Sequence, residues 1–116
     1  PSQAVLARTA LDLGLYDALG KPMPAEARTA VGPLVSQQWP GRRPPPALMQ
    51  RIDKASLAGA RGEVALAIVA ALGRQGAGDL APDVVVRMVR ALRTAGIGDG
   101  AQALALEALL LRPAGG

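Results

Sequence analysis

The residues best suited to bind a ligand are basic side chains at helical spacing. Arg87, Arg90 and Arg93 follow one another at intervals of three in an amphipathic segment. Arg51 and Lys54 stand at the same interval, 36 positions before Arg87 and Arg90. Because arginine forms bidentate hydrogen bonds with carboxylates, this row predicts a partner-binding site for acidic side chains or a C-terminal carboxylate. A solvated outer helix face explains the same spacing equally well.

Residue types that commonly catalyse reactions are scarce. The chain has no histidine and no cysteine, which removes the commonest general base and the thiolate metal ligands. Its serines therefore have no histidine to activate them. Asp12 and Asp17 are the closest acidic pair in the first helical segment, but a spacing of five places them on different helix faces. We therefore predict that the protein is not an enzyme, with no catalytic residues, no metal site and no cofactor.

Two glycine-rich stretches resemble nucleotide-binding motifs. Residues 96–101 fit the pattern GxGxxA, but that motif needs a strand before it and an acidic residue about 20 positions after it. Residues 73–78 lack the Lys-Ser/Thr that a phosphate loop uses. We interpret the first stretch as a corner between helices and the second as a linker.

The composition predicts an all-α fold. Half of the residues are apolar, Phe is absent and aromatic residues make up 2%, so the core must consist mainly of alanine, leucine and valine. Alanine and leucine favour helices, and there is almost no β-branched alternation. At 116 residues the chain allows one domain or a piece of a larger one. Since it begins with Pro rather than Met, we expect a trimmed or processed fragment.

Apolar periodicity and turn residues divide the chain into about five to six helices. Residues 1–38 are expected to form a helical hairpin in which Pro33 either kinks the second helix or begins a separate short one. Residues 39–46 read WPGRRPPP, a proline-rich linker that is predicted to seat Trp39 against the helices. Residues 47–116 are expected to form two helix–turn–helix repeats. The segments predicted to be helical there are 47–57, 63–72, 83–95 and 101–111.

The two C-terminal hairpins align with each other. Pro46 matches Pro82 at a spacing of 36, and after the corner Gly62 matches Gly100 at a spacing of 38. Val84, Val85, Met88 and Leu92 lie on one broad arc of the helical wheel, with Val86 intruding on the polar side. Asp99 is expected to cap the last helix, which is apolar nearly all round and should be covered on more than one side.

Residues 82–113 resemble a tetratricopeptide (TPR) repeat, a helix–turn–helix unit of 34 residues. Gly96, Ala101, Ala108 and Pro113 fall at the family's spacings. The first helix carries Val85, Val89 and Leu92 in place of the family's Trp, Gly and Tyr. The resemblance implies stacked antiparallel helical hairpins, a short TPR-like α-solenoid. It also implies a concave peptide-binding groove into which Lys54, Arg90 and Arg93 point.

These observations favour a non-catalytic domain for protein–protein interaction or scaffolding. Its expected partner is a protein or an acidic peptide, and its apolar C-terminal helix offers a surface for self-association. The alternative is a basic helical domain that binds nucleic acid or an anionic membrane surface, because the net charge is +4. The near absence of stacking aromatic residues argues against nucleic acid. The excess of arginine is also typical of GC-rich genomes, and the sequence does not indicate a cellular location.

Overall fold

In the computed structural model, which describes residues 2–112, the chain forms six α-helices and, over those residues, no β-strand. The prediction of an all-α protein is therefore confirmed. Pro33 lies inside one continuous helix, so the alternative of a separate helix after Pro33 is excluded. The helices are α1 (Gln3–Ala18), α2 (Ala25–Ser36), α3 (Pro46–Leu57), α4 (Arg61–Leu72), α5 (Pro82–Thr94) and α6 (Gly98–Leu110).

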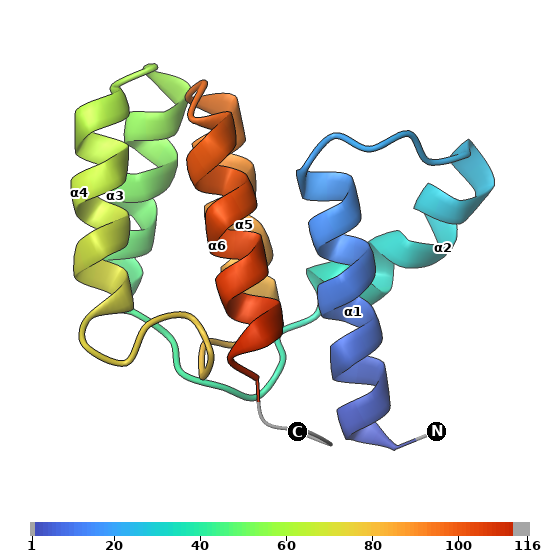
Figure 1. The fold of residues 1–116 in the computed structure, drawn as a ribbon. Coiled ribbons are helices and arrows are strands. Elements are labelled where there is room, and N and C mark those ends of the chain that lie inside the picture. Colours follow the sequence, from blue (N-terminus) through green and yellow to red (C-terminus); the bar gives the residue numbers. More distant parts are fainter. Residues whose placement is uncertain (1, 113–116) are drawn as a thin grey trace.

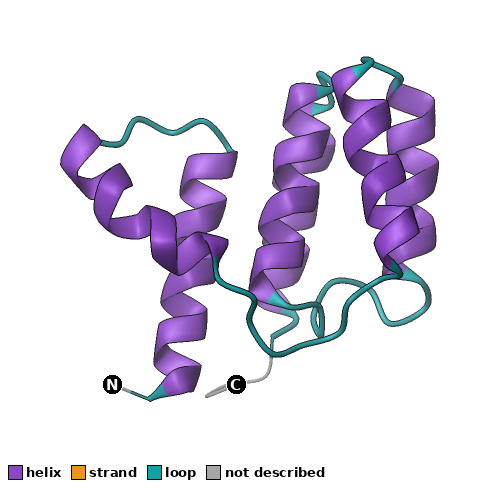
Figure 2. Ribbon diagram, turned by 180° about the vertical axis from the view of Figure 1, so that it is seen from behind, coloured by secondary structure: helices purple, strands orange, loops and turns teal. Residues whose placement is uncertain are grey.

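The helices pair in chain order, but the pairs do not lie in chain order in space. Figure 1 shows α3 and α4 on one side, α5 and α6 in the middle, and α1 and α2 on the other side. The view from behind in Figure 2 shows the same order. Helices α1, α3 and α5 all run in one direction. The N-terminal hairpin therefore lies beside the last hairpin rather than beside the middle one.

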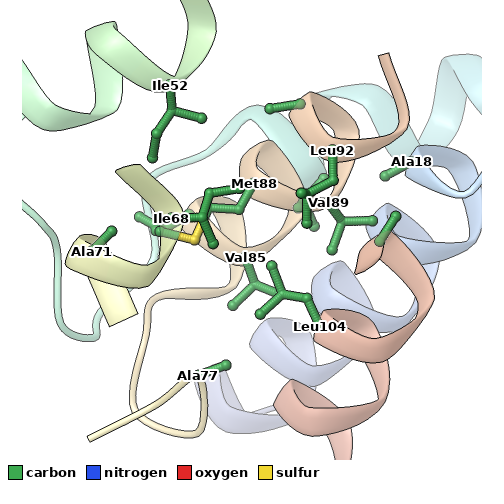
Figure 3. Packing of buried hydrophobic residues seen from close by; sticks show 14 of the residues in the cluster. Ala18, Ile52, Ile68, Ala71, Ala77, Val85, Met88, Val89, Leu92 and Leu104 are labelled. Atoms are coloured by element: carbon green, nitrogen blue, oxygen red, sulfur yellow. The ribbon is translucent and has the colours of Figure 1, made fainter. Parts of the chain in front are cut away.

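Helix α5 is the centre of the protein, because it contacts all five other helices. Val85, Met88 and Val89 are fully buried. Figure 3 shows Met88 directed toward Ile68 of α4, and Val85 beside Leu104 of α6. The core consists of alanine and branched aliphatic residues with Met49, Met88 and Trp39, as the composition predicts.

A close contact between α1 and α5 explains two irregularities in the sequence. Val86, which interrupts the polar side of its helix, is buried. A Cβ atom added at Gly14 would lie 2.6 Å from Val86 Cγ2. Glycine in the middle of α1 therefore lets the two backbones approach, and Val86 packs against α1 instead of facing solvent. The polar side of α5 is correspondingly narrower than a helical wheel indicates.

The hairpins α3–α4 and α5–α6 close with the same corner. Gly59 and Gly96 have positive φ angles of 68° and 82°, and each is followed by a residue whose N–H bonds back into the helix. Ala60 N donates to Ala55 O at 2.9 Å, and Ile97 N to Leu92 O at 2.8 Å. This is the Schellman arrangement that glycine permits.

The corners correct the predicted alignment of the second helices. Gly59 and Gly96 are 37 positions apart. The buried positions of α4 and α6 are related by the same spacing of 37, for example Val64 and Ala101. The predicted spacing of 38 is wrong by one residue. Because α6 begins at Gly98 with Ile97 at the cap position, Asp99 lies in the first turn and is not the cap. Pro113 lies outside the described residues.

The segment between α2 and α3 is held firmly in place. Trp39 is buried, and its indole N–H donates to Leu34 O at 2.9 Å. The Asp83 carboxylate at the start of α5 accepts from the backbone N–H of Trp39 at 3.0 Å and from both terminal nitrogens of Arg43 at 2.8 and 2.9 Å. The linker thus fastens α2 to the first turn of α5.

Candidate functional site

The predicted basic row is largely occupied by contacts between helices. Arg87 of α5 donates from Nε to the Asp53 carboxylate of α3 at 2.9 Å and also pairs with it through a terminal nitrogen. Both side chains remain about two-fifths exposed, at 44% and 41%. This pair ties the middle hairpin to the last one, and it neutralises Arg87.

The next two residues of the row face the N-terminal hairpin. Arg90 lies 3.4 Å from the Asp17 carboxylate of α1, and Arg28 of α2 lies 3.6 Å from the same carboxylate. The Arg93 guanidinium lies directly over Gly20, where an added Cβ would be 2.1 Å from Arg93 Cζ. The C-terminal end of a helix attracts positive charge, so Arg93 is favourably placed just beyond the end of α1.

Arg51 and Lys54 do not join this cluster. Both are exposed, and within residues 2–112 neither has a carboxylate within ion-pair distance. At about 100° per residue, Arg51 points roughly 160° around α3 from Asp53, the residue that faces α5. The structure therefore brings Arg87, Arg90 and Arg93 to one side of α5 and leaves Arg51 on the far side of α3.

A shallow depression of about 500 Å³ lies at the N-terminal ends of α3 and α5. Pro44, Pro45 and Pro46 form part of its wall, with Met49 and Val84 as further apolar contacts. Its polar lining comes from Gln38, Gln50, Arg43, Asp83 and Arg87. Because both arginines already bind carboxylates of the protein itself, the depression offers little free charge to a ligand.

Sequence reasoning missed Arg42, which makes more hydrogen bonds through its side chain than any other residue between 2 and 112. Its guanidinium donates to Ala71 O and Leu72 O at the end of α4, each at 3.0 Å, and to Gly76 O at 2.7 Å. Its Nε lies 3.0 Å from both oxygens of Asp79. The backbone of Arg42 also bridges the 73–81 loop, through Arg42 N to Asp79 O and Ala81 N to Arg42 O. Arg42 therefore serves as a cap for α4.

The 73–81 loop is held by contacts within the protein. Ala77 N donates to the Glu107 carboxylate at 2.9 Å, and the Gly76 carbonyl is bound by Arg42. Arg112 donates to Leu80 O at 2.5 Å. Burial, with a smaller contribution from Arg8, lowers the pKa of the Arg112 guanidinium, while Asp79 opposes that shift. In the described part of the chain, no group of three acidic, histidine or cysteine side chains is placed to hold a metal ion.

Besides the basic row, the protein has an apolar surface on the outer sides of α4 and α6. These helices bury one side each and leave large aliphatic side chains on the other. The exposed ones are Leu66 at 74%, Val69 at 66%, Leu106 at 57% and Leu110 at 78%.

Comparison with protein-family models, curated proteins and solved structures finds no match for this chain.

Sequence analysis predicted the apolar surface of α6 but not that of α4. The apolar character of residues 101–111 indicates that cover is needed on more than one side, and α5 covers only one. Leu104 is buried, whereas Leu106, Leu110 and Leu111 are exposed. Helix α4 also has large apolar side chains exposed on one side. Its nearly continuous run of apolar residues indicates, as in α6, that cover is needed on more than one side. We refer to the outer surface formed by Leu66, Val69, Ala103, Leu106 and Leu110 as the α4/α6 face.

Proposed function

We propose that this protein is a non-catalytic scaffold domain whose α4/α6 face binds protein. The observation that carries the proposal is the exposure of four large aliphatic side chains, two on the outer side of α4 and two on the outer side of α6. Contiguous apolar surface on a soluble domain is typical of protein–protein contact sites. Single exposed leucines would need no explanation, but here large aliphatic side chains recur opposite the buried side of each helix.

We further propose that α3–α6 are two TPR-like hairpins. The shared corner geometry at Gly59 and Gly96 supports this, as does the full burial of Ala101 and Ala108, two positions that carry the family resemblance. Helix α1 runs parallel to α5 beside it, where the first helix of a following hairpin would lie. The N-terminal hairpin would then close the stack on that side.

The basic side chains support a second, weaker candidate surface for an acidic peptide. Lys54 and Arg51 are exposed, and Arg93 is free of ion pairs with the described residues. Arg87 and Arg90 would have to exchange Asp53 and Asp17 for a ligand carboxylate. Because an exposed pair contributes only about 0–1 kcal/mol, that exchange is feasible but gains little affinity.

The same internal pairing weakens the alternative of nucleic-acid or anionic-membrane binding. A polyanion binds through several uncompensated cations and releases counterions as it does so, whereas two of the five predicted cations already face carboxylates. A DNA or RNA affinity that falls steeply with salt would support this alternative. None of the described helices has the length and apolarity needed to cross a bilayer.

Affinity capture followed by mass spectrometry tests the proposal when two surfaces are compared. The variant Leu66→Glu/Leu106→Glu should lose partner proteins that the wild type and Arg87→Glu/Arg90→Glu both retain. Retention by the apolar-face variant combined with loss by the arginine variant would instead assign binding to the basic surface. Circular dichroism of each variant controls for folding.

A further inference from the structure

We propose that a second copy of this chain covers the α4/α6 face, in a symmetric dimer in which each of the two helices lies antiparallel to its counterpart. This proposal rests on the proposed function, since it names the protein that occupies the same face. The two-fold axis would lie in the plane of the face, perpendicular to α4 and α6. A symmetric contact of this kind uses one surface twice, so that surface must be complementary to itself.

The centre of the face meets that requirement. Leu66 and Val69 lie one turn apart near the middle of α4, and Ala103 and Leu106 lie at the matching positions of α6. Reversal of the helix direction places Leu66 of one copy near Val69 of the other, and the small Ala103 near Leu106. The exposed residues between the helix ends are alanine, leucine, valine and Gln102, so no charge is buried at the centre.

The ends of the helices favour the antiparallel orientation over the parallel one. Both helices run in the same direction (Figure 1), and their first turns carry the carboxylates of Glu63 and Asp99. Arg61 at the same end offsets one of them. The opposite end carries the exposed Arg74, whereas Arg112 at that end is partly buried and already donates to Leu80 O. In an antiparallel dimer, the N-terminal ends of α4 and α6, with their carboxylates and positive dipole ends, face the C-terminal helix ends of the other copy, where basic charge and the negative dipole ends lie. A parallel dimer would bring like ends together.

The size of the face indicates a modest affinity. Complete burial removes roughly 60–120 Å² of apolar area per Val or Leu side chain from water, so the four side chains supply a few hundred square ångströms. A stable interface needs about 800 Å² from each partner, which is more than these four side chains supply. We therefore expect dissociation constants in the micromolar range, on the order of 10 µM, rather than an obligate dimer.

Sedimentation equilibrium of the whole chain over a wide concentration range tests the association. The wild type should shift from monomer to dimer, and Leu66→Glu/Leu106→Glu should remain monomeric. Leu57→Glu is the matched control, because Leu57 is 83% exposed but belongs to α3, one turn after the Asp53 that pairs with Arg87 of α5, and is not part of the α4/α6 face. It should dimerise like the wild type.

A charge exchange tests the orientation. Glu63→Arg and Arg74→Glu should each weaken dimerisation at low salt by roughly three- to tenfold, and the double variant should recover most of the loss. Failure of the double variant to recover overturns the antiparallel arrangement. A wild type that stays monomeric overturns self-association but leaves the proposed function to the capture experiment. A dimer that survives Leu66→Glu/Leu106→Glu overturns the assignment of the face to self-association.

Discussion

Replacement of Arg42 by alanine tests the role that the structure gives to the linker. The Arg42 side chain is only 26% exposed, and its guanidinium binds three backbone carbonyls at the end of α4 and in the following loop. The last carbonyls of a helix have no partner within the helix. Arg42→Ala would therefore leave Ala71 O, Leu72 O and Gly76 O without their donor.

The magnitude follows from the number and type of these bonds. A hydrogen bond from a charged donor contributes about 1.5–3 kcal/mol, but bonds that share one group are not additive. Water can reach part of the exposed 73–81 loop, which reduces the loss further. We expect Arg42→Ala to lower the free energy of unfolding by about 2–4 kcal/mol. The ion pair with Asp79, whose side chain is 47% exposed, adds at most a small part of this.

Urea denaturation followed by far-ultraviolet circular dichroism measures this loss. Arg74→Ala is the matched control, since Arg74 lies exposed in the same loop and should change the free energy of unfolding by less than about 0.5 kcal/mol. Arg42→Lys should behave like the alanine variant, because the ammonium group of lysine cannot reproduce the planar guanidinium, which donates to several carbonyl oxygens at once. Equal stability of the Arg42 and Arg74 alanine variants would refute the capping role.

Three further predictions concern individual contacts. Gly96→Ala should cost about 1–2 kcal/mol because its φ angle is 82°, whereas Gly62→Ala, in the first turn of α4 with open space around it, should stabilise by about 0.4–1 kcal/mol. Thermal denaturation of both variants checks this, and a loss at Gly62 would contradict it. A double-mutant cycle on Arg87 and Asp53 should give a coupling below about 1 kcal/mol, since both side chains are two-fifths exposed; a larger value would mean that the pair is shielded from water. Trp39→Phe should cost about 1–3 kcal/mol through loss of the bond to Leu34 O and of buried volume, measured by circular dichroism, and an unchanged midpoint would show that Trp39 is not anchored by that bond.

The helices themselves were largely predictable from the sequence. Proline at the first turns of α3 and α5, glycine at their ends and the apolar stripe of α5 are local signals, and each acts through backbone geometry or burial along one segment. Serine is a common helix cap, and Ser2 caps α1, since its hydroxyl accepts from Val5 N at 3.2 Å. Boundaries shifted by one to three residues, and the start of the last helix moved from 101 to 98, which places Asp99 in the first turn of α6 instead of at its cap.

The arrangement of the hairpins and the fate of the arginines were not predictable in the same way. The close approach of Gly14 to Val86 depends on two residues 72 positions apart, and no local pattern links them. Likewise, the spacing of Arg87 and Arg90 indicates a charged stripe but does not reveal that Asp53 and Asp17 lie opposite. Arg42 resembles Arg43 in sequence, and only the fold places it at the end of α4.

The central claim, that the α4/α6 face binds a second copy of the chain, is tested most directly by nuclear magnetic resonance. Backbone amide spectra of the uniformly labelled chain, recorded while the protein is diluted, report which residues leave an interface. We predict that the resonances that move with concentration belong to α4 and α6, centred on Leu66 and Leu106, while those of α3 remain fixed. Spectra that do not change with concentration, or that change along Arg87, Arg90 and Arg93 instead, would contradict the claim.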